Sequence, residues 1–67
     1  MQGTIKKIID QRGFGFIATE DAEDDIFFHR SQCKGGLLFE ELKEGQVVEF
    51  EIEETMKGPQ AVNVTAV

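Results

Sequence analysis

The sequence has one cysteine, one histidine and one proline, and it contains neither tryptophan nor tyrosine. The lone Cys33 excludes an internal disulfide framework and cannot build a cysteine-rich zinc site by itself. The single His29 lacks the partner ligands that a metal ion needs. We therefore expect packing to stabilise the fold, with no metal site and no cofactor.

Long apolar runs are also absent, and none approaches the length that crosses a membrane. The N-terminus carries the polar Gln2 and Thr4 where a secretory signal would need a basic segment followed by an apolar one. With 67 residues, the chain is near the lower size limit for one hydrophobic core. We expect one domain over residues 1–67, monomeric and cytoplasmic, without a membrane partner.

Basic residues are scarce, since seven Lys and Arg face thirteen Asp and Glu for a net charge of −6. This balance argues at first against a polyanionic partner. The charges are segregated, however: residues 3–19 and 26–36 are each net positive, whereas the acids gather in residues 20–25 and 37–54. Two local basic segments therefore remain available to a nucleic acid.

Short apolar segments between turn-rich stretches indicate an all-β fold, a small barrel or sandwich. The expected strands cover residues 4–9, 13–18, 25–29, 48–53 and 62–66. In the fourth, strict alternation places Val48, Phe50 and Ile52 on one face and three glutamates on the other. The last two strands should form a hairpin around a turn at residues 57–59.

Three connecting features complete the expected fold. The Lys6-Lys7 pair interrupts alternation in the first strand and predicts a bulge or strong twist. Residues 20–24 form an acidic turn, for which a solvated loop is the simplest interpretation. Residues 31–45 should be irregular, with at most a short helical turn at residues 37–42.

Alternation also predicts a cluster of rings on the outer face of the second and third strands. Ile26 and Phe28 should point inward. Four flat rings would then share one outer face, from Phe14, Phe16, Phe27 and His29. Unstacked bases can stack on such rings whatever their sequence, and Arg12 and Arg30 flank the cluster as candidate phosphate or stacking contacts.

A Phe-x-Phe pattern in a strand is more often ordinary packing than a ligand site. Gly13 and Gly15 favour a site instead, because glycine weakens a strand and suits the close approach of another backbone. His29 has no nucleophile or carboxylate motif around it, so we expect no catalytic residue and no enzyme. Cys33 is expected to be an incidental thiol.

Two segments resemble the paired ribonucleoprotein-type motifs of the cold-shock domain family, residues 12–17 the first and residues 25–29 the second. The similarity extends along almost the whole chain, to Gly3, Lys6, residues 44–46, residues 57–61 and residues 63–65. The resemblance implies a five-stranded antiparallel Greek-key barrel of the oligonucleotide-binding (OB) class. It also implies a protein that binds single-stranded RNA or DNA and acts as an RNA chaperone in translation or cold adaptation.

Residue by residue, the resemblance assigns base stacking to Phe14, Phe16, Phe27 and His29. It places Lys6, Arg12 and Lys57 near the nucleic-acid backbone, Asp25 at the rim, and Phe39 as a further stacking ring in a long loop.

The chain departs from the family pattern at several positions, and at two of them, 7 and 30, a cation stands in place of a ring. Lys7 stands where the family usually has tryptophan, and Arg30 where it has phenylalanine; Ile8 and Ile9 replace a phenylalanine and an asparagine. Each lost ring removes about 1–3 kcal/mol of stacking, whereas the added cations attract phosphates by an interaction that salt weakens. We therefore expect weak, salt-sensitive binding, with Lys7 and Arg30 among the contacts.

Two other functions stay open at this point. The acidic face of Glu49, Glu51 and Glu53, or the exposed rings, could dock another protein, giving an acidic interaction barrel with little or no nucleic-acid binding. An acidic mimic of nucleic acid has only composition in its favour and ranks last.

Overall fold

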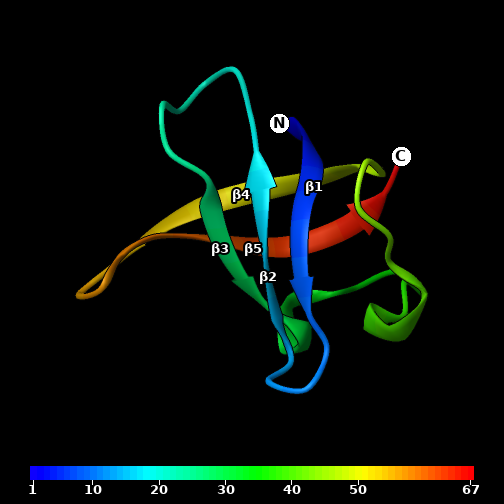
Figure 1. The fold of residues 1–67 in the computed structure, drawn as a ribbon. Coiled ribbons are helices and arrows are strands. Elements are labelled where there is room, and N and C mark those ends of the chain that lie inside the picture. The colour runs from blue at the N-terminus through cyan, green and yellow to red at the C-terminus, as the bar shows by residue number, and fades with distance from the viewer.

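The computed structural model describes residues 1–67 and forms a closed barrel of five strands (Figure 1). The strands are β1 (Gln2–Ile9), β2 (Phe14–Ala18), β3 (Ile26–His29), β4 (Val47–Thr55) and β5 (Gly58–Ala66). Neighbours around the barrel follow the order β1-β2-β3-β5-β4, and β4 pairs back onto β1. This order confirms the predicted all-β Greek-key barrel.

Four of the strand pairings are antiparallel, and β3 with β5 is parallel. An odd number of strands cannot alternate direction all the way around a closed barrel. One parallel contact is therefore unavoidable, and it falls where β5 returns beside β3 through the pairs Phe27 with Gln60 and Phe28 with Ala61.

The predicted bulge in β1 is present, because the β1–β2 register shifts between Ile5 and Lys7. A second shift interrupts β4 and β5 between Glu49 and Glu51. Opposite this shift Asn63 adopts a positive φ of 52°, and its side chain donates a hydrogen bond of 2.8 Å to Glu51. Bulges increase local strand bending, which a small barrel needs in order to close.

Inward side chains of all five strands and of the long loop fill the barrel. The buried core consists of Ile5, Ile17, Ile26, Phe28, Phe39, Leu42, Val48, Phe50, Ala61 and Val64. Ile52 packs against this core while Glu49, Glu51 and Glu53 are exposed, as alternation predicted.

The segment between β3 and β4 is irregular apart from two 3-10 turns, η1 (Arg30–Gln32) and η2 (Phe39–Glu41). The second of these is the short helical turn predicted within residues 37–42. The β4–β5 hairpin is longer than predicted, and its tip extends past β3 (Figure 1). No helix has the length and apolar character to cross a membrane.

Candidate nucleic-acid interface

Three phenylalanine rings and one imidazole lie together on the outer face of β2 and β3. The register pairs Phe14 with His29 and Phe16 with Phe27. The ring centroid of Phe14 is 5.3 Å from that of Phe27 and 5.8 Å from that of Phe16, and Phe16 is 6.0 Å from Phe27. We call Phe14, Phe16, Phe27 and His29 the aromatic platform.

Strand alternation produces this platform. Gly15, Ile17, Ile26 and Phe28 are buried on the inner face of the two strands, and each platform residue is partly exposed on the outer face. The four rings therefore offer apolar surface that no other part of the chain covers completely. Flat, partly exposed rings of this kind suit stacking with unpaired bases.

Packing inside the barrel explains why residue 15 is a glycine. A Cβ atom at this position would lie 2.7 Å from the Lys7 carbonyl oxygen and 2.8 Å from the Phe28 ring. Glycine at this position predicted the close approach of another backbone. That backbone is the one of β1. Gly15 by itself therefore gives no sign of a ligand.

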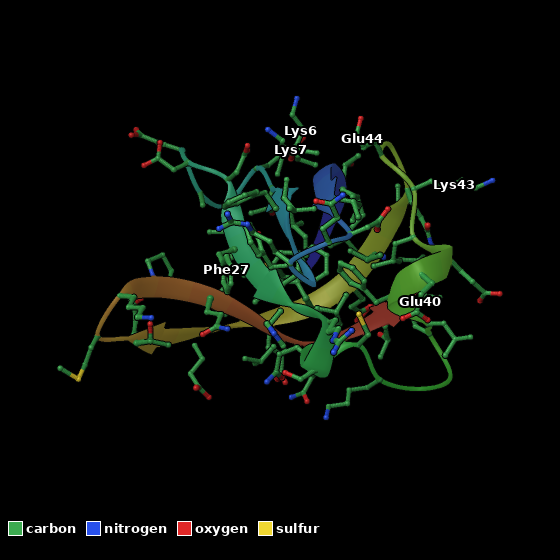
Figure 2. All side chains as sticks on the ribbon, turned by 60° about the horizontal axis from the view of Figure 1, so that its bottom comes forward. Lys6, Lys7, Phe27, Glu40, Lys43 and Glu44 are labelled. Atoms are coloured by element: carbon green, nitrogen blue, oxygen red, sulfur yellow. The ribbon has the colours of Figure 1, made fainter.

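Cations border the platform on the β1 side. Lys7 is paired with Phe16 across β1 and β2, so its side chain leaves the sheet on the platform face. Lys6 and Lys7 are exposed, and Figure 2 shows both side chains reaching into solvent from β1. The structure therefore places Lys7 on the platform face and leaves Lys6 exposed next to it.

Arg30 lies across the turn that precedes β2. Its backbone N–H donates to the Gly13 carbonyl oxygen at 2.9 Å. Its Cδ lies 3.0 Å, and its Nε 3.3 Å, from the place that a Cβ of Gly13 would occupy. Gly13 has a positive φ of 73°, and its missing side chain also leaves room for the Arg30 stem at the residue that precedes Phe14. Arg12, the other predicted arginine, is exposed in the same turn.

A shallow groove extends the platform toward the β4–β5 hairpin. Its lining consists of Phe27, Thr55, Lys57, Gly58, Pro59 and Gln60. Lys57 was expected near the nucleic-acid backbone, and the structure brings it to the same groove as Phe27. The other four lining residues were not predicted, because the parallel pairing of β3 with β5 brings the β5 residues beside Phe27, and Thr55 follows as the β4 partner of Gly58.

Phe39 does not lie on the surface, so the prediction of an exposed stacking ring at this position is wrong. Its side chain is 6 % exposed and packs against Phe28 with a centroid distance of 6.0 Å. The 3-10 turn η2 folds the ring back over the open end of the barrel core. Asp25 is exposed immediately before β3, and its role as a rim contact stays a prediction.

Other reactive groups do not form a site. No group of three or more His, Cys, Asp or Glu side chains could hold a metal ion. Burial raises the pKa of the Cys33 thiol, and the nearby negative charge of Glu40 raises it further. A raised pKa lowers the thiolate fraction, so Cys33 has the character of an unreactive thiol.

Comparison with known proteins agrees with this geometry. Residues 1–67 match the family described as the 'Cold-shock' DNA-binding domain. The chain is 48 % identical to the cold shock-like protein CspC of Escherichia coli strain K12, over 100 % of this chain and 96 % of the relative. It is 50 % identical to the major cold shock protein of Streptococcus pyogenes serotype M18, over 96 % of this chain and 92 % of the relative.

A solved structure titled drosophila Unr CSD456 superimposes with a TM-score of 0.81 at 26 % sequence identity. The match covers 98 % of this chain and 26 % of the Unr chain. The barrel therefore corresponds to about a quarter of the chain in that solved structure.

Proposed function

Because the chain belongs to the cold-shock domain family, we propose that it binds single-stranded RNA or DNA on the aromatic platform and acts as an RNA chaperone or cold-shock-type regulator. The observation that carries the proposal is the cluster of Phe14, Phe16 and Phe27, whose centroids lie within 6.0 Å of one another on one partly exposed face. Bases from an unpaired strand can stack on these rings, whereas paired bases in a duplex cannot reach them.

The cations around the platform would contact the phosphates. Lys7 on the platform face and Arg30 beside Phe14 replace two rings, so part of the binding free energy comes from charge attraction. Released counterions make such attraction fall as salt rises. Binding is therefore weak and salt-sensitive, and we propose Lys6, Arg12 and Lys57 as further phosphate contacts and Asp25 as a rim contact.

The net charge of −6 restricts where a nucleic acid can approach. The exposed glutamates of β4 repel a polyanion, whereas the cations near β1, β2 and the hairpin tip attract one. A nucleic-acid strand would thus be directed to the aromatic platform. No observation favours the alternative of a protein-interaction barrel, and we propose a monomeric, cytoplasmic, non-catalytic protein.

To test this, the labelled protein is titrated with a short oligothymidine at low salt. The NMR chemical-shift changes of the backbone amides are measured. We expect the largest shifts in β2 and β3 around the platform, and none from a blunt duplex of the same length. Val47→Ala, which changes an exposed apolar residue of β4 without changing the charge, serves as a control variant with unchanged affinity. The absence of any response to oligothymidine would contradict the proposal.

A second titration at two ionic strengths tests the role of the cations. The affinity should fall as the salt concentration rises, with a slope set by the number of phosphates contacted, about 0.7 in log K per contact for a single strand. A salt-independent affinity would show that Lys7 and Arg30 do not take the place of the missing rings.

A further inference from the structure

The imidazole of His29 is held by the residue two positions along the chain. The backbone N–H of Ser31 donates to Nδ1 of His29 at 3.1 Å, and the Ser31 hydroxyl lies 2.9 Å from the same nitrogen. A backbone N–H can only donate, so Nδ1 must be the acceptor and carries no proton. The neutral ring then has its proton on Nε2.

The opposite nitrogen of the ring has no partner within the chain. His29 makes its hydrogen bonds through Nδ1 alone, and its side chain is partly exposed. Since the two nitrogens lie on different sides of the imidazole, Nε2–H points away from Ser31. The register places His29 opposite Phe14, beside the ring on which a base would stack. The platform thus contains one oriented donor among three purely apolar rings.

We propose that Ser31 is a positioning residue for nucleic-acid binding, which fixes His29 as a donor through Nε2–H to an oxygen of the nucleotide that stacks on Phe14. The proposal rests on the proposed function and goes beyond it, because stacking alone requires no particular tautomer. Oxygen acceptors on the nucleotide are the base carbonyls and the phosphate, and both accept the same donor.

The tautomer itself can be observed in the free protein by long-range proton–nitrogen NMR of the imidazole. We expect the Nε2–H form in the wild type and in Ser31→Thr, which keeps both donors. Ser31→Ala removes the hydroxyl but keeps the backbone N–H, so we expect the Nε2–H form to remain while a share of the Nδ1–H form appears. The affinity for oligothymidine should fall in proportion to the lost share of the Nε2–H form, by about 2-fold for an equal mixture. Should Ser31→Ala lose stability yet keep the wild-type tautomer and affinity, the contact between His29 and Ser31 only caps η1, whose N-cap residue is His29, and the proposal fails.

The acceptor can be identified with modified ligands and the variant His29→Phe, which keeps a stacking ring without the donor. One ligand replaces each thymine by difluorotoluene, which has the shape of thymine without carbonyl acceptors; another carries neutral methylphosphonate links. On unmodified oligothymidine we expect His29→Phe to bind about 2- to 12-fold more weakly than the wild type.

That difference between wild type and His29→Phe should vanish on the difluorotoluene ligand if the acceptor is a base carbonyl. It should become smaller on the methylphosphonate ligand if the acceptor is the phosphate, because the remaining phosphonate oxygen is a neutral and weaker acceptor. A difference that is unchanged on both modified ligands, or equal binding of wild type and His29→Phe to unmodified oligothymidine, overturns the inference. In either case continued binding of oligothymidine would leave the proposed function standing, since only the absence of binding contradicts that.

Discussion

Phe27 and Phe28 are neighbours on β3 and share a residue type, yet they lie in different environments. Phe28 is 0 % exposed in the barrel core, whereas Phe27 lies on the outer face among the platform rings. The other phenylalanines divide in the same way: Phe39 and Phe50 are buried, and Phe14 and Phe16 are partly exposed outside. Half of the phenylalanines thus stabilise the barrel, and the other half remain free for a ligand.

The largest effect expected from this division is on stability. Phe28→Ala removes a fully buried ring and should lower the free energy of unfolding by about 3–5 kcal/mol, most of the stability of so small a domain. Phe27→Ala, one residue away, should cost about 1 kcal/mol or less, because its ring loses only contacts with its platform neighbours. Urea unfolding followed by circular dichroism measures both, and equal losses would remove the distinction between the two faces.

Phe39 should behave as a core ring despite its place in a loop. Phe39→Ala is expected to lower the free energy of unfolding by about 3 kcal/mol, since the ring is buried against Phe28. The folded variant should still bind oligothymidine with wild-type affinity. This is measured by titration at low temperature, where the variant is folded. A weakened affinity with an unchanged free energy of unfolding would show that Phe39 belongs to the binding surface.

The outcome for Phe39 shows where sequence patterns are informative. In β2, β3 and β4 the direction of each side chain follows from a period of two, which is a local property that the sequence carries. The lysine pair that breaks this period in β1 likewise revealed the bulge. Between β3 and β4 no period exists, so the sequence alone could not tell whether the Phe39 ring faces the core or the solvent.

The groove beside Phe27 was not predicted from the sequence, for a different reason. Its far wall comes from Pro59 and Gln60, which lie more than thirty residues along the chain. They reach Phe27 only through the parallel contact that closes the barrel. Pairing between distant segments is set by the whole fold, and no local pattern in either segment specifies it.

The outer rings should affect binding more than stability. Phe16→Ala removes one stacking surface and should weaken oligothymidine binding by about 1–3 kcal/mol, which is about 5- to 150-fold. Its unfolding free energy should change by about 1 kcal/mol or less. Val47→Ala, an exposed apolar residue on β4, is a matched control that should leave the affinity unchanged. A large loss of stability in Phe16→Ala would assign this ring to the core.

Arg30 allows a smaller and more specific test, because it can be converted into a further outer ring. Its stem already lies over Gly13, the residue that precedes Phe14, so we expect Arg30→Phe to place a ring next to the platform. One phosphate contact is lost, and the slope of log K against log salt should become shallower by about 0.7. The added stacking offsets the lost charge at low salt, so the affinity there should change little. Arg30→Gln, which loses the charge without gaining a ring, should show the same shallower slope with weaker binding at every salt concentration. If both variants keep the wild-type slope, Arg30 contacts no phosphate, and the outer face binds by its rings without help from this cation.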